Sequence, residues 1–377
     1  MMRLIYLNDG LSSVFHSQVA ALLNWYQQQG WFSEVILITA YNHQEEREKI
    51  RLQISAKIPV LFFRLAPNYP FFNFVNIMRL RRCLSRVNPA DENTIIHIRG
   101  GMLALYYAGT GNKYFFPART LVDMRGTSYE EVELYFKLPF FLKKLKLSNV
   151  ARAYCALNLY PFLSAVSYSL KQYLQEKVNV SSQIEVIPSL CGENFIFDRN
   201  QREKIRKELQ LDDGEILLVF SSAGMASWQN DFILEKIKGE KIKVLNLSKK
   251  KKEAKHIITL FVSYEQMPAY LAAADGALVF RNGDVVNRVA SPVKFSEYVC
   301  MGLPVITNGT IEAVNDFIRK YQAGLIVNNM HEVNEEKIKK LCLTADREKI
   351  AMQGKKEYSL QTVAEKYVLL YKTMTGQ

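Results

Sequence analysis

The sequence predicts an α/β protein made of two doubly wound, Rossmann-like parallel-sheet domains, and three observations point to it. The chain has 377 residues, more than one ordinary hydrophobic core organises. Short apolar strand patterns alternate with helical patterns, and this alternation breaks near residue 190 and then starts again. Hydrophobic residues make up 49% of the chain, which supplies enough apolar surface for two cores.

The first half of the chain begins with an apolar strand pattern at residues 3–7. A helical pattern over 14–29 follows, and Gly30 closes it. Further strands are expected at 34–39, 59–65, 94–98 and 120–123, with helical material between them, and the strand-like I-E-V-I-P lies within 178–188.

The second half repeats this order of elements. Strands are expected at 215–220, 241–247, 257–262, 276–280, 305–307 and 324–327, and helices at 231–238, 267–274 and 312–321. Two runs of strand–helix alternation indicate two parallel sheets with helices on their faces.

The domain boundary is expected between Pro188 and Gln201, where Gly192 and Asn194 interrupt the pattern. The first domain then spans 1–190 and the second 201–357. A helical region over about 347–374 follows, and its last part, 358–377, is expected to cross back to the first domain. Two such domains leave a central cleft that faces the carboxyl ends of both sheets, where open α/β folds bind ligands.

Composition limits the class of protein. The five cysteines contain no C-x-x-C pair, which argues against a metal site or disulfide framework and favours a reducing cytoplasm. The first residues carry too short an apolar run for a signal peptide, and no run approaches a membrane span. The formal net charge of +12 suits nucleic acid, an anionic membrane surface or a phosphorylated substrate, and composition does not choose among them.

The most informative segment is 291–306, S-P-V-K-F-S-E-Y-V-C-M-G-L-P-V-I. Ser291 is expected to cap a helix whose first position is Pro292. Lys294 lies in the first turn, where it opposes the helix dipole unless an anion is bound there. Glu297 lies one turn on, on the same face, where a carboxylate can accept hydrogen bonds from a ribose. An ordinary capped helix with a solvated Lys294–Glu297 ion pair is the competing interpretation.

This segment resembles the donor site of GT-B glycosyltransferases of the family-4, retaining type, in a variant with S-P-x-K-x-x-E-Y followed by G-x-P-V-I. The resemblance implies that Lys294 contacts the diphosphate of a nucleotide sugar and that Glu297 holds its ribose. It also implies catalysis without a metal or other cofactor. Many members carry a second glutamate eight residues before the one that matches Glu297. This chain has Val289 there, so the role falls to backbone groups or to a residue such as Asp284.

The loop after the expected strand at 215–220 reads S-S-A-G-M-A-S-W-Q. Small residues let a backbone approach a phosphate closely, so Ser222, Gly224 and Gln229 are predicted donor contacts. In the resembled family this loop contacts the donor and many members carry an arginine and a lysine in it. This chain has neither, so the contacts with the anionic diphosphate are expected to fall to Lys294, with Arg281 or Arg288 as further candidates. A simple strand-to-helix turn remains the alternative.

Residues of the first domain are predicted to face the acceptor. Ser12 and Ser13 belong to a loop between a strand and a helix, His16 begins that helix, and Arg99 ends another strand. Polar side chains at such strand ends are placed to meet a ligand. Packing of His16 on its own domain is equally open.

The segment V-D-M-R-G at 122–126 resembles a first-domain site in some of these transferases. That resemblance implies that Asp123 orients the acceptor hydroxyl and that Arg125 pairs with a phosphate, and we count both as catalytic candidates. A structural Asp–Arg bridge is the alternative.

The stretch 135–156 interleaves aromatic and aliphatic residues with four lysines and an arginine. This composition suits a segment at a lipid interface, with cations near anionic headgroups. An amphipathic helix packed on its own domain explains it equally well.

The sequence therefore predicts a metal-independent GT-B hexosyltransferase that moves a sugar from a nucleotide-diphosphate sugar to a hydroxyl acceptor. A lipid-linked or cell-surface polysaccharide intermediate at the cytoplasmic face of the membrane is the favoured acceptor, and nucleic acid is not an expected partner. A nucleotide-sugar epimerase of the same fold, or a basic nucleic-acid or membrane-surface binding protein, is the alternative.

Overall fold

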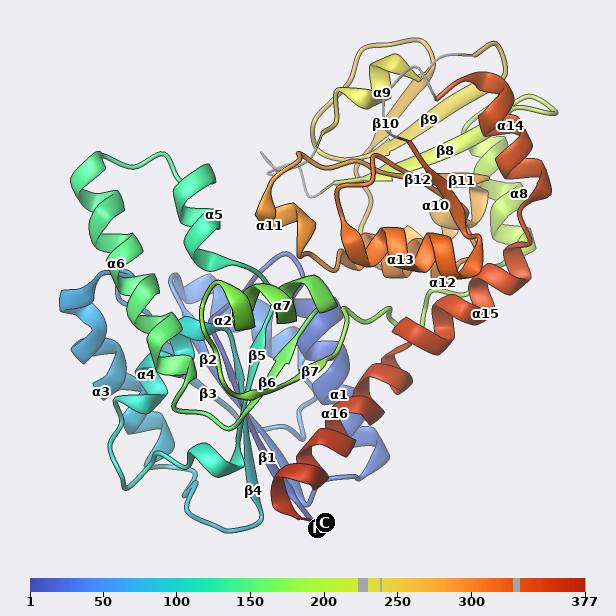
Figure 1. Cartoon of the computed structure of the whole chain (residues 1–377). Helices are drawn as coiled ribbons and strands as arrows, with labels where there is room; N and C mark the ends of the chain where they lie inside the picture. Colours follow the sequence, from blue (N-terminus) through green and yellow to red (C-terminus); the bar gives the residue numbers. More distant parts are fainter. Residues whose placement is uncertain (223–229, 238, 328–332, 377) are drawn as a thin grey trace. The chain divides into compact units, whose positions relative to one another are not determined.

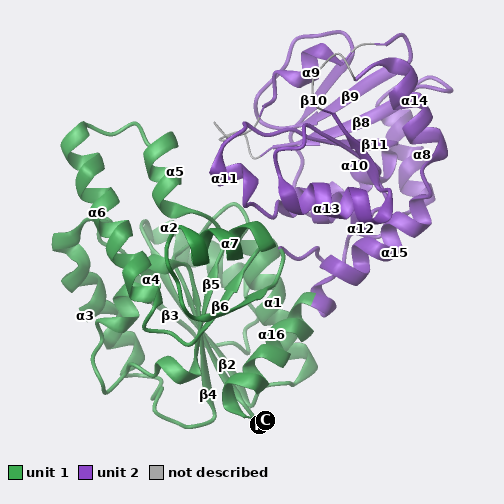
Figure 2. Cartoon of the chain, in the orientation of Figure 1, with its two compact units in different colours: residues 1–188, 363–377 green, residues 189–362 purple. Residues whose placement is uncertain are grey.

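The computed structural model describes residues 1–222, 230–237, 239–327 and 333–376. The chain divides into two compact units (Figure 2). Unit 1 comprises residues 1–188 and 363–377, and unit 2 comprises 189–362. The segment that links the units therefore lies at the start of the stretch where the sequence pattern breaks.

Unit 1 is built on a seven-stranded parallel sheet with order β3-β2-β1-β4-β5-β6-β7 (Figure 1). Its strands are β1 (Arg3–Asn8), β2 (Glu34–Tyr41), β3 (Val60–Arg64), β4 (Thr94–Arg99), β5 (Thr120–Met124), β6 (Phe162–Ala165) and β7 (Gln183–Val186). The strand order reverses between β1 and β4, so the loops after these two strands flank the switch point where ligands bind in such sheets. Strand β6 was not predicted, because F-L-S-A is short and carries a serine.

The helices of unit 1 cover both faces of its sheet (Figure 1). They are η1 (His16–Ala20, a π-helical turn), α1 (Ala21–Gln29), α2 (Gln44–Gln53), η2 (Pro70–Phe72), α3 (Asn73–Leu84), α4 (Gly101–Ala108), η3 (Pro117–Arg119), α5 (Ser128–Tyr135), α6 (Phe140–Leu157), α7 (Tyr168–Glu176) and α16 (Leu360–Thr375). The expected return of the C-terminal helix is confirmed, since residues 363–377 belong to unit 1 and the Tyr26 hydroxyl donates to the Ala364 carbonyl at 3.2 Å. None of the helices in the described ranges is long and apolar enough to cross a membrane.

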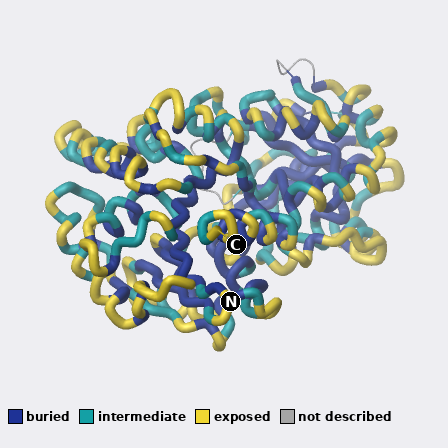
Figure 3. The backbone as a smooth tube through the Cα atoms, turned by 60° about the horizontal axis from the view of Figure 1, so that its bottom comes forward, coloured by how far each residue is buried: buried dark blue, intermediate teal, exposed yellow. Residues whose placement is uncertain are grey.

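Unit 2 is built on a six-stranded parallel sheet with order β10-β9-β8-β11-β12-β13. Its strands are β8 (Ile216–Ser221), β9 (Ile242–Leu247), β10 (Ile257–Leu260), β11 (Gly276–Val279), β12 (Val305–Thr307) and β13 (Gly324–Ile326). Its helices are α8 (Arg199–Glu208), α9 (Ile233–Lys236), α10 (Met267–Ala273), α11 (Val285–Arg288), α12 (Val293–Cys300), α13 (Glu312–Tyr321), α14 (Glu335–Thr344) and α15 (Arg347–Tyr358). The inner strands β8, β11 and β12 are buried along their whole length, as expected for a parallel sheet with helices on both faces. Figure 3 shows the buried segments of the backbone in dark blue. Together the two sheets confirm the two-domain Rossmann-like fold.

Helix α12 packs closely on α15, and glycines make this approach possible. Gly302 ends the helix with φ of +74°, and a Cβ there would lie 2.4 Å from the Arg347 carbonyl oxygen. A Cβ at Gly354 of α15 would lie 2.6 Å from the carbonyl carbon of Val299. The expected helix end at Gly302 is thus confirmed, and the contact fixes α12 against the rest of unit 2.

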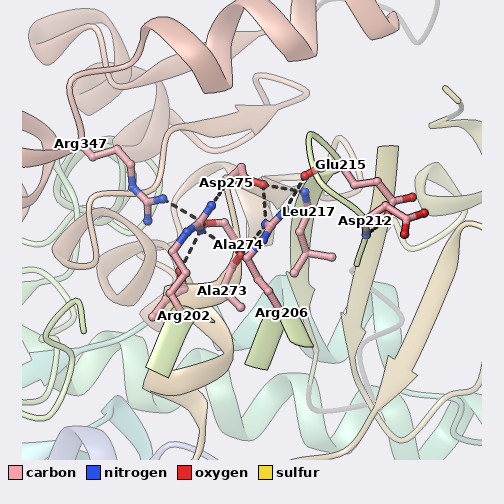
Figure 4. Close-up of polar contacts among 10 residues, drawn as sticks. Arg202, Arg206, Asp212, Glu215, Leu217, Ala273, Ala274, Asp275 and Arg347 are labelled. Atoms are coloured by element: carbon pink, nitrogen blue, oxygen red, sulfur yellow. Dashed lines mark hydrogen bonds and ion pairs between the residues drawn. The ribbon is translucent and has the colours of Figure 1, made fainter. Parts of the chain in front are cut away.

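A network around Asp275 ties the amino ends of β8 and β11 to the helices beneath them (Figure 4). Its carboxylate accepts hydrogen bonds from Arg202, from Arg206 at 3.0 Å and from the Leu217 amide at 2.8 Å. Arg347 of α15 donates to the neighbouring Ala274 carbonyl at 3.1 Å. Because the network lies at the amino ends of the strands, it supports the sheet from the edge opposite to the ligand-binding edge.

Candidate nucleotide-sugar site

The candidate site lies at the carboxyl edge of the unit 2 sheet. The strand order reverses between β8 and β11, so the loops that follow these strands flank the switch point. Helix α12 runs back between β11 and β12, and its N-terminus therefore lies at this same edge. The N–H groups and positive dipole end of this helix make the edge favourable for an anion.

Lys294 and Glu297 form the centre of the site. The Lys294 Nζ donates to Glu297 Oε2 at 2.8 Å. The Glu297 side chain is 1% exposed and that of Lys294 is 30% exposed, so the pair is not the solvated surface pair considered as the competing interpretation. A partly exposed lysine is therefore bonded to a buried carboxylate.

Burial dominates the electrostatics of Glu297. Loss of solvent raises the pKa of this carboxyl, and the attraction and hydrogen bond of Lys294 offset the rise only in part. The second carboxylate oxygen, Oε1, has no hydrogen-bond partner among the described residues. A buried acceptor without a donor costs about 1 to 3 kcal/mol, so a ligand hydroxyl that reached it would gain from the interaction.

The start of α12 differs from the expectation. Pro292, not Ser291, is the residue that precedes the helix, and the helix begins at Val293. The Ser291 hydroxyl does not cap it, because that oxygen accepts a hydrogen bond from the Ser189 amide at 3.1 Å. The Ser189 hydroxyl in turn donates to the Ser291 carbonyl at 2.6 Å. The helix N–H groups therefore have no side-chain cap, which leaves them available to an anion.

Arg281 follows β11 at the same edge. Its backbone is clamped by Asn308, whose amide side chain accepts from the Arg281 N–H at 3.2 Å and donates to its carbonyl at 2.7 Å. Asp284 caps the short helix α11, and its carboxylate accepts from the Asn287 backbone and side chain. The carboxylate considered as a substitute for the missing glutamate is thus engaged in holding α11.

Ser222 directly follows β8, and its amide donates to the Leu247 carbonyl at 3.1 Å. Gly224 and Gln229 lie outside the described residues. The structure describes the other predicted donor residues. Ser222 and Arg281 follow strands β8 and β11, Ser291 and Pro292 precede α12, and Lys294 and Glu297 lie in its first five residues.

The predicted acceptor-side residues belong to unit 1, where the Asp123 carboxylate lies between Arg99 and Arg125. Asp123 is fully buried one residue before the end of β5, and its carboxylate lies 3.5 Å from Arg99 Nη1 and 3.6 Å from Arg125 Nη1. The Ser164 hydroxyl donates to it at 2.9 Å. The catalytic roles of Asp123 and Arg125 stay predictions. This geometry fits a carboxylate that orients two arginines, whose side chains are 12% and 17% exposed, at the carboxyl edge of the sheet.

The charge state of this cluster follows from its neighbours. Burial alone would raise the pKa of Asp123, but Arg125, His97 and Arg99 outweigh it and hold the pKa well below its usual range. Burial lowers the pKa of His97, so its ring is neutral at pH 7. The ring Nε2 lies 3.8 Å from Asp123 Oδ2, and Nδ1 shares a 2.6 Å hydrogen bond with the Tyr371 hydroxyl of α16.

The remaining acceptor-side candidates lie early in the chain. Ser12 and Ser13 are exposed in the loop after β1, and His16 is exposed at the start of η1. Arg99 and Arg125 are brought together by Asp123. Gln18 joins the cluster, because its side-chain oxygen accepts from Arg125 Nη2 at 3.4 Å.

Sequence reasoning missed several partners in both clusters. Ser189 and Asn308 lie far along the chain from Ser291 and Arg281, and Tyr371 lies 274 residues from His97. No local pattern marks such residues. Ser164 was missed together with β6, the unpredicted strand that carries it. Among the described residues, no three metal-binding side chains gather into a site.

Comparisons with known proteins bear on the class of protein. Residues 225–351, within unit 2, match the family model of the glucosyltransferase 3-like C-terminal domain. No curated protein sequence matches the chain.

Solved structures resemble the whole chain. A glycosyltransferase from Rickettsia africae is 15% identical with a TM-score of 0.70, over 99% of this chain and 98% of that one. Sucrose-phosphate synthase from Thermosynechococcus elongatus is 10% identical with a TM-score of 0.71, over 100% of both chains. HepE of Anabaena in complex with UDP-glucose is 11% identical with a TM-score of 0.71, over 99% of this chain and 100% of that one.

At these identities the likeness establishes the fold, which is that of the GT-B glycosyltransferases. The domain match and the fold together support a glycosyltransferase.

Proposed function

We propose that the protein transfers a sugar from a nucleotide-diphosphate sugar to a hydroxyl acceptor. The observation that carries this proposal is the pair on α12, where Lys294 lies over a buried Glu297 whose Oε1 lacks a partner in the described structure. A cation for a diphosphate and a carboxylate for ribose hydroxyls are combined within one helical turn. The UDP-glucose complex of HepE supports this type of donor.

In this mechanism Lys294 changes partner. Without donor it neutralises Glu297, and with donor its Nζ turns to the diphosphate while the ribose hydroxyls hydrogen-bond Glu297. Negative charge builds on the diphosphate as the sugar bond breaks, and Lys294 with the uncapped helix N-terminus stabilises it. Arg281 and Ser222 at the same edge contribute further contacts to the donor, and resemblance implies retention of configuration without a metal.

Unit 1 supplies the acceptor side of the proposal. Arg99 and Arg125, held by Asp123, bind an anionic group of the acceptor and bring its hydroxyl into position, together with Ser12, Ser13 and His16. The basic charge of the chain and the 135–156 segment favour a lipid-linked or cell-surface polysaccharide intermediate. The protein would then act on the cytoplasmic face of a membrane as a peripheral enzyme.

The test is a panel of nucleotide sugars, with release of nucleoside diphosphate measured with and without lipid-linked saccharide acceptors. We expect one donor to be turned over in an acceptor-dependent reaction that Lys294→Ala abolishes. Acceptor-independent conversion of the sugar would instead identify an epimerase of the same fold. Absence of turnover and of any donor-induced thermal shift would contradict both.

A further inference from the structure

Five large apolar side chains are exposed on the neighbouring elements η2, α3 and α6 of unit 1. Phe71 of η2, Phe74 of α3 and Met78 of α3 are 62%, 70% and 46% exposed, and Phe140 and Phe141 at the start of α6 are 83% and 68% exposed. Exposed large apolar side chains on neighbouring elements are typical of an interaction site. We call these five residues, together with the arginines at 79, 81, 82 and 86 and Lys144, the α3–α6 surface.

The two parts of this surface belong to one layer of helices. Helices α3, α4 and α6 pack side by side in sequence order (Figure 1). The Asn73 side chain at the start of α3 donates to Asn149 of α6 at 2.7 Å, and Asn149 donates to Asn68 at 2.6 Å. The exposed residues of η2, α3 and α6 therefore lie on adjacent elements whose placement is fixed by hydrogen bonds.

Cations lie on the same elements as the apolar residues. The sequence from residue 65 to 90 contains no Asp or Glu and carries four arginines, at positions 79, 81, 82 and 86. None of these arginines forms an ion pair with a carboxylate in the described structure, although Arg81 lies over the Tyr114 ring, 5.6 Å from its centroid. A groove of about 540 Å³ runs between Phe74, Met78, Arg81 and Arg82. On α6, Lys144 is exposed close to Phe141.

We propose that the α3–α6 surface docks on an anionic phospholipid bilayer. The phenylalanines and Met78 would enter the boundary between headgroups and acyl chains, and the arginines and Lys144 would meet the phosphates. This inference deepens the proposed function, because it assigns to particular residues the membrane contact that a lipid-linked acceptor requires.

The positive charge of the α3–α6 surface favours an anionic bilayer over a second copy of the chain as its binding partner. A two-fold interface through this surface would bring like patches together and place arginines against arginines. Such juxtaposition of like charges costs several kcal/mol at an interface. An anionic bilayer instead offers negative charge over its whole area and an apolar layer just beneath it.

Sedimentation of the full chain with vesicles tests the proposal. We expect binding to mixed phosphatidylcholine–phosphatidylglycerol vesicles and little binding to phosphatidylcholine alone. The double variant Arg82→Gln with Lys144→Gln should lower the partition coefficient about 30-fold, because each cation near an anionic membrane surface contributes roughly 1 kcal/mol of attraction. Phe140→Ser with Phe141→Ser should weaken it by at least about 10-fold, because these side chains would no longer enter the bilayer.

Matched controls come from α2. Helix α2 connects β2 to β3, and α3 connects β3 to β4, which lies in the opposite direction along the sheet. Because crossover connections between parallel strands are right-handed, the two helices cover opposite faces of the sheet. Leu52 of α2 is 87% exposed, and Lys49 is exposed on the same helix. Leu52→Ser and Lys49→Gln should leave vesicle binding unchanged.

Three results would overturn the proposal: no sedimentation with anionic vesicles, equal losses in the α2 controls, or self-association of the chain through this surface. Donor-induced thermal shifts, measured on the same variants without vesicles, should remain at the wild-type value. Failure of donor binding in wild type would count against the proposed function alone, since vesicle binding is read independently.

Discussion

The hydrogen bond of 2.8 Å between Lys294 Nζ and Glu297 Oε2 engages one oxygen of a buried carboxylate and leaves the other without a partner among the described residues. In the proposed donor site, this Lys294–Glu297 contact would be replaced by contacts of each residue with the donor. Binding of a diphosphate would draw Lys294 away, and ribose hydroxyls would replace it at Glu297.

Replacement of Lys294 by methionine should lower kcat by about 100- to 1000-fold, the usual effect of losing one group that stabilises developing negative charge. The measurement is steady-state turnover with the donor that the panel identifies. Lys339→Met is the matched control, because Lys339 pairs with Glu335 at 2.6 Å on the exposed helix α14. Equal turnover in the two variants would contradict the role of Lys294.

The buried Glu297 should also give a pH dependence of stability. Its pKa is raised in the folded chain, chiefly by burial, so its contribution to the free energy of unfolding is fully present below the unfolded pKa near 4.5. That contribution is lost as the pH rises through the folded pKa. Lys294→Met removes the influence that lowers this pKa, so the decline should become larger and extend to higher pH.

Urea unfolding of this variant across pH measures the effect. Addition of Glu297→Gln to Lys294→Met should remove the extra pH dependence, because the titrating group is gone. An identical pH profile in the single and double variants would show that Glu297 is not its source.

Tyr371 should stabilise unit 1 through His97. Tyr371→Phe removes the hydroxyl that is 2.6 Å from His97 Nδ1 in a fully buried position, and the free energy of unfolding should fall by about 1 to 3 kcal/mol. Tyr168→Phe is the control, because Tyr168 is 73% exposed. Equal stabilities of the two variants in urea would mean that the buried hydrogen bond contributes nothing.

The Asp275 network should contribute to stability and not to donor recognition. Asp275→Asn leaves Arg202 and Arg206 without their carboxylate, and we expect a loss of about 2 to 3 kcal/mol in the free energy of unfolding. Donor affinity, measured by calorimetry below the unfolding transition, should stay at the wild-type value. A large loss of affinity without a loss of stability would reverse this assignment.

The sequence predicted the fold well where periodicity is local. The alternation of strands and helices located both sheets, and the S-P-x-K-x-x-E-Y segment identified the helix that carries Lys294 and Glu297. Helix boundaries were less accurate, since the hydroxyl of Ser291 has a partner 102 residues away that no local pattern reveals. The C-terminal helical region proved to be two helices, α15 and α16, which break at Ser359.

The sequence also did not predict which of the candidate side chains are buried. A lysine and a glutamate three residues apart are equally typical of a solvated helix face and of a ligand site. The packing of α12 in unit 2 encloses Glu297 and so shows only that the pair is not a solvated one. The same holds for Asp123, whose position at a strand end was predicted but whose contacts with Ser164 and His97 depend on tertiary structure.

The most direct test of the account compares a nucleoside diphosphate with its 2′,3′-dideoxy analogue in binding to wild type and to Glu297→Ala. If Glu297 holds the ribose, wild type should bind the dideoxy analogue about 10- to 100-fold more weakly than the parent, and Glu297→Ala should bind the two alike. The same preference for the ribose hydroxyls in both proteins would contradict the donor site described for α12.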